Sequence, residues 1–189
     1  MKCLFLGYDS KKTKLINFLK KKKIKVKSKK TSLLFKDIVE NDLIVSFGYR
    51  KIIKKNLIFK VKRPIINLHM SYLPYNRGAH PNFWSFVNNT PKGVTIHEID
   101  KGIDTGKIIL QKRVKFDLKK NPKMTFKQTY NILFKELENL FIKNFQKIIF
   151  NRYKLKDNRM IKNSFKKSSY LPKNIKKWDI KILDYLEKL

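Results

Sequence analysis

Residues 64–78 read PIINLHMSYLPYNRG, and the expected architecture follows from the way this segment is built. An apolar run ends with two polar side chains, Asn67 and His69, and a proline and a glycine then interrupt the chain. Pro64 stands at the first position of the run, where a strand tolerates its ring. The pattern predicts a buried β-strand over residues 64–69 that stops at a polar turn.

Strand-like and helix-like segments alternate on both sides of this run. The continuous apolar run DLIVSF at residues 42–47 is typical of a strand covered on both faces. Strands are expected at residues 2–7, 24–28, 42–47, 64–69, 93–100 and 107–116, and helices at 10–23, 48–58, 80–89 and 125–150. This alternation predicts an α/β fold with a mostly parallel central sheet, flanking helices and a later antiparallel strand pair.

One domain is expected over residues 1–150, followed by a short basic C-terminal extension over residues 151–189. Within residues 125–150, apolar side chains recur at helical spacing, so this helix is expected to pack its apolar stripe on the core. Beyond residue 151 the pattern becomes polar and basic, and a last helix is expected at residues 175–189.

The net charge of +32 raises the question of a polyanionic partner. Only six of the 46 basic residues are arginine and alanine occurs once, a composition typical of an AT-rich coding sequence. A surface that reads phosphate groups is expected to use more arginine, because its planar fork suits bidentate contacts. Nucleic acid is therefore not the expected partner, and an anionic substrate drawn in by the positive field stays open.

The cysteine content and the hydropathy pattern point to a cytoplasmic protein. The single cysteine, Cys3, lies within the first expected strand and cannot form an intramolecular disulfide. No run of 18 uncharged apolar residues is present, so no membrane span is expected. The apolar run near the start is too short for a secretory leader.

Three turns are expected to meet where the parallel strands end, since ligands of open α/β sheets bind beyond the carboxyl ends of the strands. Asn67 and His69 point to the same side because they are two residues apart on a strand. Asp104 lies in the loop DKGIDTG at residues 100–106. An amide can donate to an oxygen that gains negative charge, an imidazole can move a proton, and a nearby carboxylate can raise the pKa of that imidazole.

These groups suit direct acyl transfer to an amine, because no serine or cysteine nucleophile stands beside them. Each group also has a purely structural explanation. Asn67 could cap a turn, His69 could be satisfied by its neighbours, and Asp104 could hold its loop. The residues by themselves leave these explanations open.

The order of the surrounding motifs resembles that of the folate-dependent formyltransferase family. The matching motifs are Asn67-x-His69, Leu73-Pro74, Arg77-Gly78, Gly93-Val94-Thr95-x-His97 and the loop from Asp100 to Gly106. The resemblance implies a Rossmann-like formyltransferase fold that moves a formyl group from N10-formyltetrahydrofolate to a primary amine, without a metal. It maps the catalytic trio of the family onto Asn67, His69 and Asp104.

The resemblance also implies how the site works. Asn67 and a protonated His69 would stabilise the oxyanion, and Asp104 or a water that it holds would take the proton of the amine. The residues implied to bind the cofactor are Tyr49, Arg50, Ile52 and Ile103. Those implied to border the acceptor are Tyr75, Asn76 and Arg77, with Arg77 either meeting a pyrophosphate or bracing the loop. His97 matches a family position, and its place within a strand indicates a structural role.

Three acceptors are compatible with the family. Glycinamide ribonucleotide is disfavoured because the loop after the first strand, LGYDSKKTK, has one glycine where a phosphate-binding loop needs more. Methionyl-tRNA is disfavoured because 39 residues follow residue 150, and a C-terminal β-barrel needs about 100. A nucleotide-linked amino-dideoxysugar, as in lipopolysaccharide O-antigen biosynthesis, is therefore favoured over these two and over a non-catalytic folate- or RNA-binding module.

Two points stay open at this level. The 41 residues before DLIVSFGYR are fewer than family members usually have there, so the place of the nucleotide is undecided. A homodimer is compatible with the sequence and is not required by it.

Overall fold

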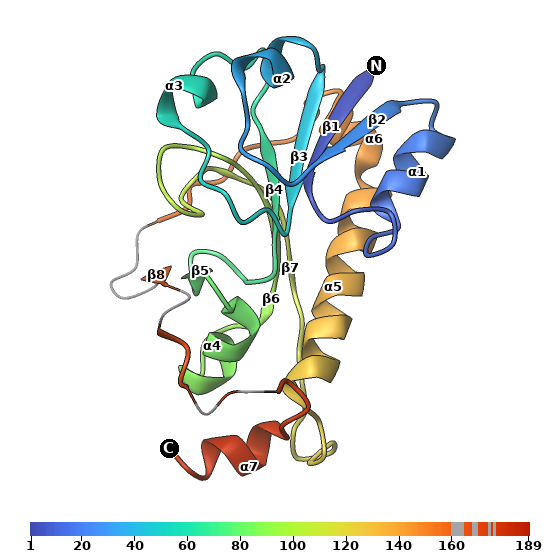
Figure 1. The fold of residues 1–189 in the computed structure, drawn as a ribbon. Helices are drawn as coiled ribbons and strands as arrows, with labels where there is room; N and C mark the ends of the chain where they lie inside the picture. The colour runs from blue at the N-terminus through green and yellow to red at the C-terminus, as the bar shows by residue number, and fades with distance from the viewer. Residues whose placement is uncertain (160–164, 168–169, 174, 176) are drawn as a thin grey trace.

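The computed structural model describes residues 1–159, 165–167, 170–173, 175 and 177–189. Its centre is a six-stranded sheet with the order β2-β1-β3-β4-β6-β7 (Figure 1). The strands are β1 (Lys2–Gly7), β2 (Lys25–Lys29), β3 (Leu43–Phe47), β4 (Ile66–His69), β6 (Gly93–Glu98) and β7 (Ile108–Arg113). The first four are parallel, whereas β6 is antiparallel to both β4 and β7. The predicted α/β fold and its late antiparallel pair are confirmed.

Helices cover both faces of this sheet, as Figure 1 shows. They are α1 (Leu15–Lys21), α2 (Phe35–Val39), α3 (Lys55–Ile58), α4 (Pro81–Val87), α5 (Phe126–Lys143), α6 (Phe145–Ile149) and α7 (Ile182–Leu186). The larger core, beside α1, α5 and α6, contains Phe5 and Val45. The smaller core, beside α2 and α3, contains Leu4 and Ile44. Because successive strand residues point to opposite faces, β1 and β3 need apolar residues at nearly every position.

β4 carries two polar side chains to the end of the sheet. Ile66 and Leu68 belong to the larger core, and Ile65 on the opposite face belongs to the smaller one. Asn67 and His69 share the face of Ile65, because strand residues two apart point to the same side. Pairing between β3 and β4 ends at Leu68, so the chain leaves the parallel part of the sheet directly after His69.

The single helix predicted over residues 125–150 is divided in two. α5 ends at Lys143 and α6 begins at Phe145. Asn144, between them, has φ −109° and ψ 13°, outside the helical region. Its side-chain Nδ2 donates to the carbonyl of Leu140 at 2.9 Å and so competes with the backbone for that acceptor. The prediction of one continuous helix was wrong at this asparagine.

The last helix is shorter than predicted, since α7 begins at Ile182 and residues 177–181 are not helical. The carbonyls of Trp178 and Ile180 accept, at 2.8 and 3.2 Å, hydrogen bonds from the first N–H groups of α5. The first turn of a helix has no internal acceptors for these N–H groups, so this segment supplies them. None of the helices in the described ranges is long and apolar enough to cross a membrane.

A third apolar cluster and a small sheet join this C-terminal part to the domain. The buried members of the cluster are Phe83, Phe86, Phe126, Ile182 and Tyr185. The small sheet consists of β5 (Arg77–Gly78) and β8 (Phe165–Lys166), which pair in parallel. In Figure 1 the small sheet and α4 lie below the loops that follow the parallel strands, with α7 at the lower end.

Candidate active site

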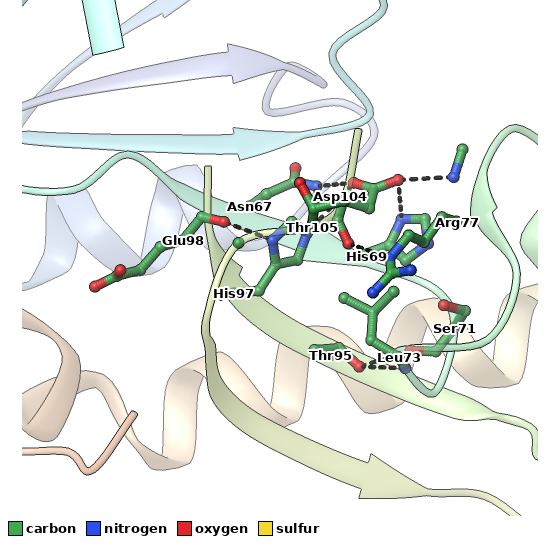
Figure 2. A network of polar contacts seen from close by, with 12 residues as sticks. Asn67, His69, Ser71, Leu73, Arg77, Thr95, His97, Glu98, Asp104 and Thr105 are labelled. Carbon is green, nitrogen blue, oxygen red and sulfur yellow. Dashed lines mark hydrogen bonds and ion pairs between the residues drawn. The ribbon is translucent and has the colours of Figure 1, made fainter. Parts of the chain in front are cut away.

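Asn67, His69 and Asp104 line one cavity of about 650 Å³ beyond the end of β4. Asn67 Nδ2 donates to Asp104 Oδ1 at 3.1 Å, and His69 Nδ1 lies 3.5 Å from Asp104 Oδ2 (Figure 2). β4 supplies the first two side chains, and the loop between β6 and β7 supplies the third. The structure therefore brings the three predicted catalytic side chains together beside an open volume.

The backbone at Asp104 turns its carboxylate toward β4. Asp104 has φ +52°, a left-handed conformation that aspartate adopts more readily than most residues. Gly78 N–H donates to Asp104 Oδ2 at 2.8 Å, and Arg77 Nε donates to the Asp104 carbonyl at 2.9 Å. The side chain and the main chain of Asp104 are thus both anchored from β5.

His97, which the sequence suggested to be structural, belongs to the same network. Its Nε2 lies 3.3 Å from Asp104 Oδ1 and 3.0 Å from Asn67 Nδ2. Its Nδ1 donates to the Glu98 carbonyl at 2.7 Å, since a carbonyl only accepts. Asn67 and His97 are direct partners in the β4–β6 register, and this pairing of strands is the signal that reading the sequence alone missed.

Both N–H groups of the Asn67 amide already have acceptors within the site. One faces Asp104 Oδ1 and the other faces His97 Nε2, as Figure 2 shows. An amide nitrogen has two hydrogens, so donation to a substrate oxygen requires the exchange of one of these bonds. The Asn67 amide is therefore held within this network by Asp104 and His97.

Burial lowers the pKa of His69 below its ordinary value of 6.5, although Asp104 acts in the opposite direction. His69 is only 7% exposed, and an imidazolium loses most of its hydration there. The sequence-based expectation that Asp104 would raise this pKa is corrected, because the cost of burial exceeds the attraction of the carboxylate. The ring is accordingly neutral in the resting site at neutral pH.

At the carboxyl group of Asp104, the neighbouring groups affect the pKa more than burial does. Burial by itself would raise its pKa, but His69, His97 and the N–H of Gly78 together hold the pKa well below its usual range. Asp104 is thus ionised at every physiological pH and is a weak base. A carboxylate with so low a pKa favours a role in orienting its neighbours over the expected role of taking the proton.

The four residues expected to bind the cofactor all line the cavity: Tyr49, Arg50, Ile52 and Ile103. Ile52 and Ile103 are 82% and 47% exposed, so they offer apolar surface to a ligand. The Tyr49 hydroxyl donates to the carbonyl of Thr31 at 2.8 Å, which fixes the ring at the wall of the cavity. Their place agrees with a cofactor role, which stays a prediction.

The three residues expected to border the acceptor are not part of this cavity lining, although the structure describes all of them. Asn76 is buried and donates to Thr90 Oγ1 at 2.7 Å, while its carbonyl lies 3.2 Å from His69 Nε2. Arg77 is 1% exposed and lies under the Asp104 loop. The Tyr75 carbonyl accepts from Ser71 Oγ at 2.8 Å.

These positions keep the three side chains out of the lining of this cavity, and their contact with an acceptor stays a prediction. Asn76 has φ +53°, a left-handed conformation that asparagine tolerates in turns, and it is 2% exposed. The alternative expected for Arg77, that it braces the loop, is the one that the geometry supports. Ala79 and His80, just beyond the predicted three, line the cavity instead.

Strand order and site together place the chain among the α/β proteins that bind ligands beyond the ends of parallel strands. A comparison with known families is more specific. Residues 4–138 match the formyl transferase family, and the chain belongs to this family. The resemblance read from the motifs is thereby confirmed, and with it the Rossmann-like character of the fold.

Among solved structures, the chain is similar to the formyltransferase PseJ from Anoxybacillus kamchatkensis, solved in complex with UDP-4,6-dideoxy-4-formamido-L-AltNAc and tetrahydrofolate. The identity is 35% and the TM-score 0.86, with 97% of this chain and 96% of the other covered. The agreement therefore extends over nearly the whole length of both chains.

Among curated proteins, two kinds of relative are similar over shorter ranges. The methionyl-tRNA formyltransferase of Finegoldia magna is 37% identical over 82 residues, which are 43% of this chain and 26% of the relative. The GDP-perosamine N-formyltransferase of Brucella melitensis biotype 1 is 35% identical over 77 residues, 40% of this chain and 30% of the relative. The match thus spans less than a third of each curated relative.

Proposed function

We propose that the protein is an N-formyltransferase that moves a formyl group from N10-formyltetrahydrofolate to the amine of a nucleotide-linked amino-dideoxysugar. The observation that carries the proposal is the convergence of Asn67, His69 and Asp104 on one cavity. An amide, a neutral imidazole and a fixed carboxylate provide the groups that an acyl transfer to an amine needs.

The acceptor that we favour is a UDP-linked 4-amino-4,6-dideoxysugar. PseJ, which was solved with a sugar nucleotide of this type, is similar over 97% of this chain. The short segment before β3 and the small C-terminal part are therefore compatible with a nucleotide-sugar substrate. The sequence match to the Finegoldia magna methionyl-tRNA formyltransferase covers 82 residues, which are 43% of this chain. We assign the activity to the synthesis of a surface polysaccharide such as an O-antigen.

The donor would lie against Tyr49, Arg50, Ile52 and the loop that contains Ile103. Two exposed isoleucines and a tyrosine offer apolar contacts for a flat ring system, and Arg50 offers a positive charge for an anionic tail. Tetrahydrofolate is present in the PseJ complex. When bound, the folate supplies the formyl group.

The groups of the site support the following course of the reaction. The amine nitrogen forms a bond to the formyl carbon, and the carbonyl electron pair moves to oxygen. Asn67 exchanges one of its internal bonds for a bond to this oxyanion. Neutral His69 takes the proton of the amine, and Asp104 stabilises the imidazolium that forms. His69 returns the proton to the folate nitrogen as the bond between that nitrogen and the formyl carbon breaks.

The direct experiment mixes the protein with N10-formyltetrahydrofolate and one acceptor at a time, and follows the release of tetrahydrofolate. UDP-, dTDP- and GDP-linked amino-dideoxysugars, glycinamide ribonucleotide and methionyl-tRNA are compared. We expect turnover with the UDP-linked 4-amino sugar and little with the other acceptors. Turnover with methionyl-tRNA or glycinamide ribonucleotide alone would refute the choice of acceptor.

Two variants test the roles of the residues. Asn67→Ala and Asp104→Asn are each expected to reduce kcat by about 10²- to 10³-fold, the usual effect of losing one group that stabilises the oxyanion or its partner. Thermal unfolding should remain cooperative, since both residues stand at the cavity. Asn17→Ala, at an exposed position on α1, is the matched control and should keep the wild-type rate. Wild-type turnover in Asn67→Ala would contradict the mechanism.

A further inference from the structure

The C-terminal extension contacts the loop between β6 and β7, which contains Asp104. Lys156 and Ile108 exchange two main-chain hydrogen bonds, of 2.9 and 2.8 Å, at the start of β7. This bridge fixes the direction of the chain over the next residues. As a result, Asn158 comes to lie against the loop that ends at Gly106.

Asn158 uses both ends of its carboxamide there. Its Nδ2 donates to the carbonyl of Asp104 at 2.9 Å and to that of Gly106 at 3.0 Å. Its Oδ1 accepts from Arg77 Nη2 at 2.7 Å. With the donor and the acceptor both engaged, the orientation of the amide is determined and only an asparagine of this reach satisfies all three partners.

Arg77, the first residue of β5, also binds the carbonyl of Asp104. Its Nε donates to the Asp104 carbonyl at 2.9 Å, so this one carbonyl receives donors from both Arg77 and Asn158. The next residue, Gly78, holds the carboxylate of Asp104. Arg77 and Asn158 therefore fix the main chain of Asp104, and Gly78 aligns its side chain.

Packing alone does not hold this loop. In front of it lies the 650 Å³ cavity of the active site, which Ile103 and Asp104 line. Behind it lies a second cavity of about 520 Å³, lined by Thr105, Gly106 and Asn158 among others. A segment with open volume on two sides has few apolar contacts to fix it, so its hydrogen bonds decide its position.

We propose that Asn158 is a positioning residue of the active site, which holds the main chain of Asp104 so that the carboxylate meets His69 and Asn67. The inference rests on the proposed function for its effect on catalysis, although the positional effect itself can be measured without any substrate. The proposal gives the C-terminal extension a role in the active site. The family motifs end at Gly106, before this extension begins.

The kinetic test compares Asn158→Ala with Asn158→Asp. Aspartate keeps an oxygen for Arg77 but loses the N–H that binds the two loop carbonyls. We expect both variants to lower kcat by about 10- to 100-fold, with little change in the KM of either substrate, because small displacements of a catalytic group have effects of this size. Asp157→Ala, at the exposed neighbouring position, is the matched control and should behave as wild type.

The positional test follows the imidazole of His69 by NMR. Because Asp104 favours the protonated ring, a carboxylate that moves away should lower the titration midpoint of His69. We expect Asn158→Ala to shift the midpoint downward, by less than Asp104→Asn does, and Asp157→Ala not to shift it. A purely structural asparagine would lower the melting temperature and leave this midpoint unchanged.

The outcomes separate the two proposals. If no acceptor is formylated but the midpoint shifts as expected, the positioning inference stands and the proposed function fails. If Asn158→Asp restores the wild-type kcat, or if the midpoint of Asn158→Ala equals that of the wild type, the positioning inference is overturned. Should Asn158→Ala fail to fold, Asn158→Ser replaces it in both measurements.

Discussion

Among the individual residues, Asp104 is the one on which the others converge. Its carboxylate faces Asn67, His69 and His97, and its carbonyl faces Arg77. A group with this many partners is held in one orientation and stays ionised, while the buried ring of His69 stays neutral. The unequal pKa shifts of the two groups support the proposed division of roles, in which the imidazole transfers the proton and the carboxylate gives electrostatic support.

The titration of His69 tests this division of roles. In the wild type its midpoint should lie below 6.5, because burial disfavours the charged ring. In Asp104→Asn it should fall further, since the carboxylate favours the charged form more than the Asn76 carbonyl, which alone is left to favour it. The ring proton signals can be followed by NMR from pH 4 to 8 and assigned with His80→Gln and His97→Gln, as the chain has three histidines. A higher midpoint in Asp104→Asn would reverse the assignment.

Among the elements, α5 shows how local sequence and a distant segment together define a helix start. Thr125 Oγ1 accepts from Gln128 N at 3.2 Å, and Gln128 Oε1 accepts from Thr125 N at 2.9 Å. This reciprocal pair is a capping box. The carbonyls of Trp178 and Ile180 satisfy the N–H groups that follow. The start of the helix against the third apolar cluster is thereby determined.

Removing the cap hydroxyl tests its contribution. Thr125→Ala should lower the free energy of unfolding by about 1 kcal/mol, the usual value of a helix N-cap. A loss of that size lowers the melting temperature by about 2–4 °C in a chain of this length. Thr125→Ser keeps the hydroxyl and is the control, with a melting temperature near that of the wild type. An equal loss in both variants would show that the methyl group, and not the cap, is responsible.

Across the whole molecule, three apolar clusters join the sheet, its helices and the C-terminal residues. The first two cover the two faces of the sheet, and the third joins α4 and the start of α5 to α7. Ile182 of α7 is completely buried in the third cluster. The extension that contains Asn158 is thus anchored further along the chain by the apolar cluster that Ile182 shares with α4 and α5.

A large-to-small substitution at Ile182 measures how much its burial contributes to the free energy of unfolding. Ile182→Ala should lower the free energy of unfolding by about 2–5 kcal/mol, as is typical for a fully buried aliphatic residue. Leu189→Ala, at a residue that is 73% exposed, is the control and should change it little. Chemical denaturation followed by tryptophan fluorescence reports both, since Trp84 and Trp178 contact this cluster or its members. Equal midpoints for the two variants would show that α7 contributes nothing.

Much of the fold and part of the site could be read from the sequence. The continuous apolar runs of β3 and β4 and the amphipathic pattern of α5 reflect burial that every residue of an element shares, so they are visible locally. The spacing of Asn67 and His69 and the loop with Asp104 offered candidates, and the resemblance to the formyltransferase motifs selected them as the predicted trio. The break at Asn144 was missed because one side-chain hydrogen bond, without any change in hydropathy, ended α5.

Tertiary structure alone decided which partners these residues have. The contact of Asn158 with Asp104 joins positions 54 apart, and that of Asn67 with His97 depends on the register of two antiparallel strands. The direction of the pKa shift of His69 depends on how deeply the ring is buried relative to its carboxylate neighbour. Burial, register and distance through space are properties of the packed chain, because each depends on groups that come together only after folding.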